Sequence, residues 1–170
     1  YNPYDLTRTP GGSSGGTGAA LAANFGLVGI GTDTINSIRS PSSANNLVGI
    51  RPGSGLVSAD GIVPYSLTQD TAGPMARCMA DAAAVLDVIA VREMPEDTAS
   101  GTTRIGVLKS FFGTEPVNAE VNKIMAGVMN ELSEMGVELV EIEEPLQIGD
   151  LVSNVSVHLY DLKAHLNAYL

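Results

Sequence analysis

The sequence predicts an α/β protein, and two observations carry this prediction. In the second half of the chain, an amphipathic helical segment stands between two short apolar runs, the pattern of a strand, a helix and a second, parallel strand. In the first half, short apolar runs alternate with Gly- and Ser-rich turn signals. The 170 residues, 44% of them hydrophobic, suffice for one globular domain or for part of a larger one.

The first half of the chain predicts a packed helix followed by several short strands. Residues 17–26 ("TGAALAANFG") predict a helix of small residues that ends at Gly26. Residues 27–33 ("LVGIGTD") predict a buried strand. Residues 45–52 and 61–64 predict two further strand pieces, which are bounded by prolines.

A longer helix is predicted over residues 73–91. Its apolar residues fall on one helical face, formed by Met75, Met79, Ala82, Ala83, Leu86 and Ile89. The only cysteine, Cys78, lies in this segment and cannot form an internal disulfide. We therefore expect it to be a buried structural thiol in a reducing compartment, and we expect the protein to be cytoplasmic.

The second half predicts a strand over 104–108, a helix over 116–136 and a strand over 137–143, which together favour a parallel sheet. A polar loop over 92–103 precedes this unit, and the last segment predicts a helix that continues to the end of the chain. The apolar stripe of the first of these helices consists of Val121, Ile124, Val128, Leu132 and Met135. Because the sequence begins with Tyr1 and ends inside a helical pattern, we expect it to be part of a longer protein.

Composition argues against several classes of partner. The net charge is −10 and no stripe of basic residues offsets it, so we expect no nucleic-acid partner. No uninterrupted apolar run reaches about 18 residues, so no membrane span is expected. His158 and His165 have no neighbouring Cys or acidic cluster, so we expect neither a metal site nor a cofactor. Nothing in the sequence indicates an oligomeric state.

The stretch "PGGSSGGTG" at residues 10–18 has three interpretations. A flexible linker would have low-complexity flanks, whereas here the flanks are "YNPYDLTRT" and a helix. A phosphate-binding loop has backbone amides at a helix N-terminus, but no lysine follows as in a P-loop and no strand precedes as in a dinucleotide fold. The third interpretation is that the stretch forms part of an active site together with the loop that follows residues 27–33.

That second loop, "GTDTINSIRSPSS", carries a candidate nucleophile. Acyl transfer needs a hydroxyl nucleophile, a group that accepts its proton, and N–H donors for the oxyanion. Ser37 follows a strand in an exposed turn with successive backbone amides, and Arg39 is placed to brace Asp33 or the loop. An ordinary turn hydroxyl is the alternative role for Ser37 taken alone.

Four stretches, in this order, resemble the amidase signature family: "NPYDLTRTPGGSSGG", "GTDTINSIRSPSSANNLVGIRP", "GLVSADGIVPYSLTQDTAGPMAR" and "DAAAVLDVIA". The resemblance is dense over 1–91, the signature core, and looser over 104–170, which matches a following strand–helix–strand–helix segment. It implies that residues 1–170 are part of a single domain with a mixed β-sheet core flanked by helices. It also implies hydrolysis of a small-molecule or peptide amide without a cofactor.

The resemblance implies a Ser–Ser–Lys triad and assigns roles residue by residue. Ser37 is the nucleophile, and Ser13, which follows a cis peptide bond from Gly12, is the bridging residue. Ser14 supports the lysine. The oxyanion hole is formed by the backbone amides of Thr34, Ile35, Asn36 and Ser37. The family usually has Gly-Gly before the nucleophile, so Ile35 is expected to keep an ordinary backbone while narrowing the acyl pocket.

The triad lysine itself is expected upstream of the Gly–Ser loop, yet the lysines of this sequence, Lys109, Lys123 and Lys163, all lie downstream. We therefore expect the 170 residues alone to be inactive and the lysine to lie outside them. The motif around Ser37 favours a general or peptide-amide hydrolase over the transamidating subunit of a glutamyl-tRNA amidotransferase, whose usual form is closer to "SDTGGSIRQPA". A non-catalytic fragment that keeps only the fold is the remaining alternative.

Overall fold

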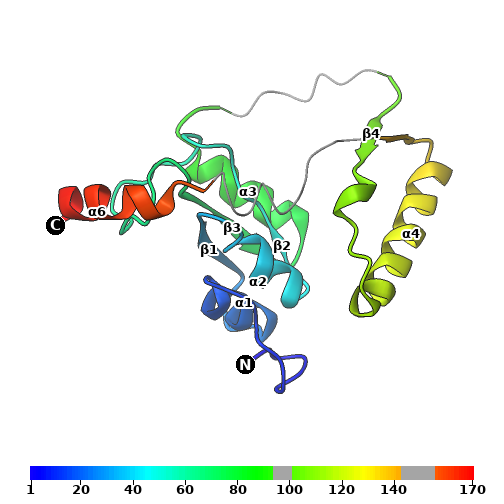
Figure 1. Ribbon diagram of the computed structural model, residues 1–170, viewed down its shortest axis with the longest axis horizontal. Helices are drawn as coiled ribbons and strands as arrows, with labels where there is room; N and C mark the ends of the chain where they lie inside the picture. The colour runs from blue at the N-terminus through cyan, green and yellow to red at the C-terminus, as the bar shows by residue number, and fades with distance from the viewer. Residues whose placement is uncertain (94–100, 143–155) are drawn as a thin grey trace. The chain divides into compact units, whose positions relative to one another are not determined.

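The computed structural model describes residues 1–93, 101–142 and 156–170 (Figure 1). Most of the loop predicted over 92–103 lies outside these described residues. The chain divides into two compact units, one formed by Tyr1–Pro95 with Val157–Leu170 and the other by Glu96–Ser156. That residues 1–170 belong to one domain stays a prediction.

The first unit is built on a three-stranded antiparallel sheet. Its strands are β1 (Val28–Asp33), β3 (Thr71–Ala76) and β2 (Val48–Gly49), in the order β1-β3-β2. Strand β1 pairs with β3 along its whole length, so that Val28 lies opposite Ala76 and Asp33 lies opposite Thr71. All six residues of the central strand β3 are buried. The end of β1 is thereby fixed beside the start of β3.

The strand β3 corrects the helix predicted over 73–91. The segment contains Pro74, which disfavours helical backbone in the residue before it, and the helix α3 begins only at Met79 and ends at Ile89. The prediction of one apolar helical face that includes Met75 and Met79 is therefore wrong. Met75 is a strand residue with 0% exposure, whereas Met79 is 62% exposed. A strand buried on both faces is a continuous apolar run, which periodicity alone does not separate from a helix.

Cys78 is exposed, contrary to the expected buried thiol. It is the N-cap residue of α3 and has extended backbone, directly after β3. Its predicted burial assumed that residues 73–91 form one helix. That assumption fails, because the residues before Cys78 form a strand.

Two short helices, α1 (Gly15–Ala22) and α2 (Arg39–Ala44), pack against each other and against the sheet. Helix α1 begins and ends earlier than the helix predicted over 17–26, which was expected to end at Gly26, and α2 was not predicted. A Cβ at Gly18 would lie 2.9 Å from Asn45 Nδ2, so glycine permits the close approach of the two helices. The core of the unit consists of Leu21, Ile38 and Met75. The strand predicted over 61–64 is wrong, because these residues have turn and irregular backbone.

Gly73 is packed too tightly for any side chain. A Cβ at this position of β3 would overlap the carbonyl oxygen of Ile50 and lie 2.7 Å from Pro52 Cδ. We expect Gly73→Ala to destabilise the full-length protein by about 1–3 kcal/mol and to lower its Tm. Gly53→Ala is the matched control, because nothing lies within 4 Å of its Cβ, and equal Tm values for the two variants would contradict the packing described.

The second unit confirms the predicted strand–helix–strand pattern. Strands β4 (Arg104–Val107) and β5 (Glu138–Glu141) pair in parallel, and α4 (Ala119–Glu134) lies between them in the sequence. Two short 3-10 helices, Lys109–Phe111 and Pro116–Asn118, precede α4. Residues 143–155, which follow β5, lie outside the described residues.

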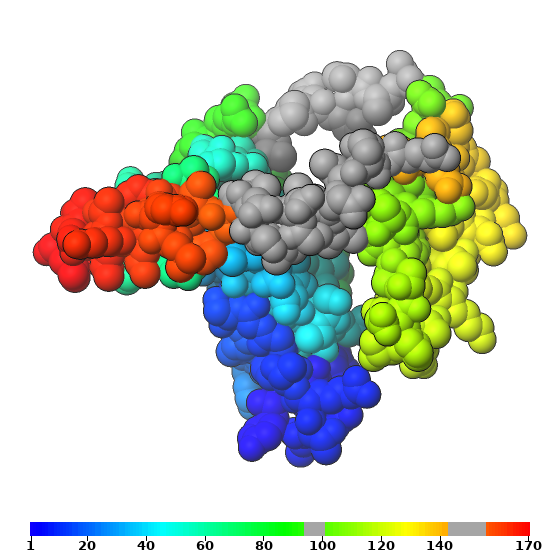
Figure 2. All heavy atoms as spheres, in the orientation of Figure 1, coloured from blue at the N-terminus to red at the C-terminus, as the bar shows by residue number. Residues whose placement is uncertain are grey.

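The last helix, α6 (His158–Tyr169), belongs to the first unit and confirms the helix predicted at the end of the chain. In Figures 1 and 2 it lies beside the loop that connects β2 to β3. None of the helices in the described part of the chain combines the length and the hydropathy of a membrane span.

Candidate active site

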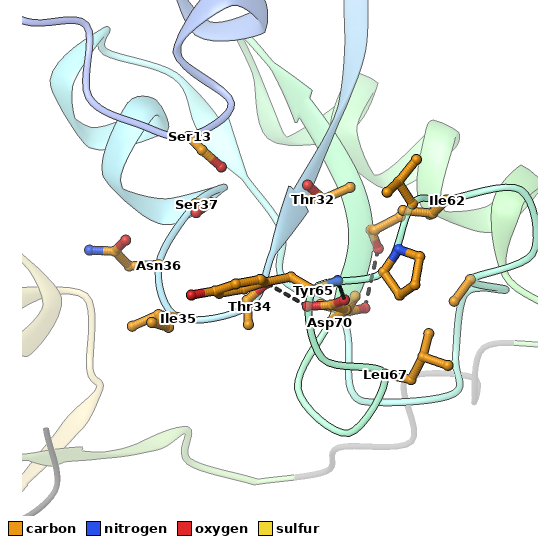
Figure 3. A pocket seen from close by; sticks show the side chains of 15 residues that line it. Ser13, Thr32, Thr34, Ile35, Asn36, Ser37, Ile62, Tyr65, Leu67 and Asp70 are labelled. Carbon is orange, nitrogen blue, oxygen red and sulfur yellow. Dashed lines mark hydrogen bonds between the residues drawn. The ribbon is translucent and has the colours of Figure 1, made fainter. Parts of the chain in front are cut away.

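A pocket of about 370 Å³ opens in the first unit where three segments meet. These segments are the Gly–Ser loop, the end of β1 with the turn after it, and the loop that leads into β3 (Figure 3). The lining residues include five that the resemblance assigns to the site: Ser13, Thr34, Ile35, Asn36 and Ser37. Residues far apart in the sequence thus share one cavity.

The two serines of the expected triad lie together at one end of this pocket. Figure 3 shows their side chains as neighbours, with Ser13 on the Gly–Ser loop and Ser37 on the turn after β1. Ser13 is exposed and Ser37 is half-buried. The peptide bond between Gly12 and Ser13 is cis, as the resemblance implies. Both hydroxyls are therefore accessible to a molecule in the pocket.

Ser14 joins the Gly–Ser loop to β1 and to the turn after it. Its amide donates to the carbonyl oxygen of Ser37 at 3.2 Å. Its hydroxyl accepts from the amide of Thr32 at 3.1 Å and lies 3.2 Å from the Thr32 carbonyl oxygen. The described residues thus give Ser14 a place in aligning the Gly–Ser loop with β1. Its support of a lysine stays a prediction.

Successive backbone amides around Ser37 are free to bind an anion. Ile35, Asn36 and Ser37 line the pocket, and within residues 1–93, 101–142 and 156–170 no hydrogen-bond acceptor is present for their amides. Neither Ile35 nor Asn36 has a positive φ, so the ordinary backbone expected for Ile35 is confirmed. An oxyanion formed at a carbonyl beside Ser37 has N–H donors within this turn.

The side chain of Asp33 holds this turn in place. It is 0% exposed and accepts from the Ile38 amide at 3.0 Å and from Arg39 Nε at 3.2 Å, which is the brace expected from the sequence. Arg51 Nε also donates to it at 3.2 Å, and sequence reasoning missed this residue. Burial alone raises the pKa of Asp33, but the hydrogen bonds from Arg39 and Ile38 outweigh burial and hold this pKa below its ordinary value.

Arg39 also closes the turn on itself. Its guanidinium donates to the carbonyl oxygen of Ile35, in addition to its ion pair with Asp33. The carbonyl oxygen of Ile35 therefore already accepts a hydrogen bond within the turn.

A second carboxylate, Asp70, was also missed. Thr34 Oγ1 donates to Asp70 Oδ1 at 2.5 Å, while the amides of Tyr65 and Ser66 each donate to Asp70 Oδ2 at 2.8 Å (Figure 3). The sequence signal available for it was an acidic residue at the entrance of a buried strand.

Helix α6 contacts the outer side of the same loop. Ser66 Oγ donates to Asp161 at 2.6 Å, and the Leu67 amide donates to His165 Nδ1 at 3.0 Å. The hydrogen bond from Ser66 is the largest influence that lowers the pKa of Asp161. The rings of Tyr65 and His158 lie 5.0 Å apart. His165 thus accepts a hydrogen bond from the loop and His158 packs against Tyr65. No metal-binding group of three or more His, Cys, Asp or Glu exists among the described residues.

Much of the pocket is lined by an apolar wall. This wall consists of the side chains of Ile35, Ile62, Val63, Pro64 and Leu67, together with the ring of Tyr65. Asp70 is the one carboxylate among the lining residues, no Lys, Arg or His lines the pocket in the described part of the chain, and both Asp70 oxygens accept hydrogen bonds. The geometry suits a neutral group with an apolar body.

Solved structures similar to this chain share its architecture. Native peptide amidase from Stenotrophomonas maltophilia matches with a TM-score of 0.83 and 37% identity, over 99% of this chain and 38% of that one. The glutamyl-tRNA(Gln) amidotransferase subunit from Thermotoga maritima matches with a TM-score of 0.79 and 26% identity, over 99% of this chain and 39% of that one. The α/β class and the amidase signature fold are thus confirmed.

Curated relatives with similar sequences are amidotransferase subunits. The corresponding glutamyl-tRNA(Gln) amidotransferase subunit from Chlorobium chlorochromatii is 38% identical over 85% of this chain and 34% of its own length. Its counterpart from Chlorobaculum tepidum is 41% identical over 85% of this chain and 33% of its own length. The chain thus spans about a third of the length of these relatives. The family model Amidase matches residues 1–169, and the chain belongs to this amidase family.

Proposed function

We propose that the full-length protein is a serine amidase that cleaves a carboxylic amide through an acyl-enzyme on Ser37. One observation carries the proposal: the hydroxyls of Ser13 and Ser37 and the unpaired amides of the turn before Ser37 line one pocket. A nucleophile, a proton relay and an oxyanion site are the components that acyl transfer requires.

In the proposed reaction, Ser37 Oγ attacks the amide carbonyl carbon and its proton passes to Ser13 Oγ, while the proton of Ser13 moves to a neutral lysine. The carbonyl oxygen becomes an oxyanion beside the amides of Ile35, Asn36 and Ser37. The C–N bond then breaks, and ammonia or an amine leaves with the proton that the relay returns. Water attacks the acyl-enzyme along the same relay, and the carboxylic acid is released with Ser37 restored.

The lysine of this relay is proposed to lie in the part of the protein outside residues 1–170. No lysine precedes Ser13 in this sequence, and the chain spans about a third of its relatives' length. Lys109 forms an ion pair with Glu141 in the second unit, at 2.5 Å, and is assigned no role in the site.

The apolar wall of the pocket supports a neutral small-molecule or peptide amide as the substrate. Transamidation from glutamine is the second candidate, favoured by the names of the curated relatives. Glutamine carries an α-carboxylate and an α-ammonium group, and no basic side chain lines the described pocket to pair with the carboxylate. The chemistry of the wall therefore favours hydrolysis of apolar amides.

Ammonia release separates the two candidates. We expect the full-length protein to release ammonia from a C-terminally amidated dipeptide with apolar side chains at least about 10-fold faster, in kcat/KM, than from glutamine, since about 1.4 kcal/mol of differential binding gives this ratio. Faster release from glutamine would favour the amidotransferase role instead. Release from neither substrate, in a protein whose Ser37 is unreactive, would contradict both roles.

A further inference from the structure

We infer that Asp70 is a positioning residue, which fixes the oxyanion segment against the apolar wall of the pocket. The inference rests on the proposed function. One carboxylate oxygen of Asp70 accepts from Thr34 Oγ1 at 2.5 Å, and Thr34 directly precedes the turn with the free amides. The other oxygen accepts from the amides of Tyr65 and Ser66 at 2.8 Å. Asp70 thus joins the two sides of the cavity.

The carboxylate matches the groups that it contacts. All three contacting groups donate, and a carboxylate is the side chain that only accepts when ionised. Such charge-assisted hydrogen bonds are shorter and stronger than neutral ones. The main-chain amide of Asp70 also donates to the Ser66 carbonyl oxygen at 2.6 Å, which closes the loop before β3.

The outer side of this loop is held separately. Helix α6 contacts it through Asp161 at Ser66 and through His165 at Leu67. Helix α6 therefore fixes the position of the loop by hydrogen bonds. Asp70, at the end of this loop, in turn fixes the position of Thr34 by accepting its hydrogen bond. Because Thr34 follows β1 and leads directly into Ile35, a displaced Thr34 displaces the oxyanion donors.

Loss of this link is expected to reduce transition-state stabilisation more than substrate binding. Removing one oxyanion donor lowers rates about 10²–10³-fold, and misplacing the donors lowers them less. We expect Asp70→Ala and Thr34→Val each to lower kcat about 10- to 100-fold in the full-length protein, with KM changed less than about 3-fold. The double variant is expected to lose no more than Asp70→Ala alone, because both changes break one link.

Matched controls separate positioning from folding. Asp87→Ala removes an exposed carboxylate on α3, and Thr102→Val removes an exposed hydroxyl in the second unit, so both are expected to keep the wild-type kcat. Asp70→Asn is expected to recover most of the loss. Its amide oxygen still accepts from Tyr65 and Ser66, and its NH₂ group can donate to Thr34 Oγ1.

The decisive readout is affinity for a boronic acid analogue of the substrate, which forms a tetrahedral adduct with the nucleophile, compared with affinity for the carboxylic acid product. We expect Asp70→Ala and Thr34→Val to weaken boronate binding in parallel with kcat/KM and to leave product binding within about 3-fold. Equal weakening of both ligands, or additive losses in the double variant, would overturn the role of Asp70. Should Asp70→Ala fail to fold, Thr34→Val carries the same test. Unaffected turnover in Ser37→Ala would instead overturn the proposed function.

Discussion

Ser37→Ala in the full-length protein is expected to lower the rate of amide hydrolysis by at least about 10⁴-fold, because the variant lacks the oxygen that is proposed to form the acyl-enzyme. The remaining rate comes from the oxyanion amides and from substrate binding, which the substitution leaves in place. The measurement is ammonia release under saturating substrate, with folding checked by circular dichroism.

Ser133→Ala is the matched control for this variant. Ser133 is an exposed serine on α4, in the second unit, and its replacement is expected to leave turnover unchanged. A Ser37→Ala variant that retains more than about a tenth of the wild-type rate would contradict the assignment of the nucleophile, since loss of a covalent nucleophile removes far more than a factor of ten.

The largest effect on stability is expected at Asp33. Asp33→Asn keeps the size of the side chain but removes the charge that pairs with Arg39 and Arg51. Breaking a buried ion pair by removing one partner costs about 3–5 kcal/mol. Because both arginines are partly exposed, we expect Asp33→Asn to lower the free energy of unfolding by about 3 kcal/mol. Urea unfolding of the full-length protein measures the loss. Asp87→Asn, an exposed carboxylate on α3, is the control and is expected to change stability by less than about 0.5 kcal/mol.

The same carboxylate gives stability a defined dependence on pH. The pKa of Asp33 is lowered in the folded protein, so its contribution is present above the unfolded-state pKa of about 3.9 and is lost as pH falls through the lower folded value. The stability difference between wild type and Asp33→Asn is therefore expected to be constant from pH 7 to about pH 5 and to shrink below about pH 4. A difference that grows on acidification would contradict this network.

Regular elements of the fold were predictable where local pattern and final structure agree. The second unit followed from the period of its helix and from the short strands on either side of it, and the parallel pairing of β4 with β5 is confirmed. Strand β3 was not predictable in this way. Burial on both faces removes the alternation that marks a strand, and the neighbouring helix α3 extends the same apolar run.

The site was predictable as far as its motif is contiguous. Ser13 and Ser37 each lie in a contiguous sequence motif, and in the structure both line one pocket. Arg51 and Asp70 were missed because each acts through a partner distant in the sequence, Asp33 for the first and Thr34 for the second. Such contacts depend on which strands become neighbours. The pairing of β1 with β3 brings these residues together, and it could not be read from the sequence.

Covalent labelling of the full-length protein with a fluorophosphonate, followed by peptide mass spectrometry, tests the central assignment most directly. The probe reacts with an activated serine and leaves an adduct of defined mass on it. We expect one adduct, on the peptide that contains Ser37, with none in Ser37→Ala and slower formation in Ser13→Ala. Absence of an adduct would support a fold without catalysis, and an adduct on another serine would contradict the proposed site.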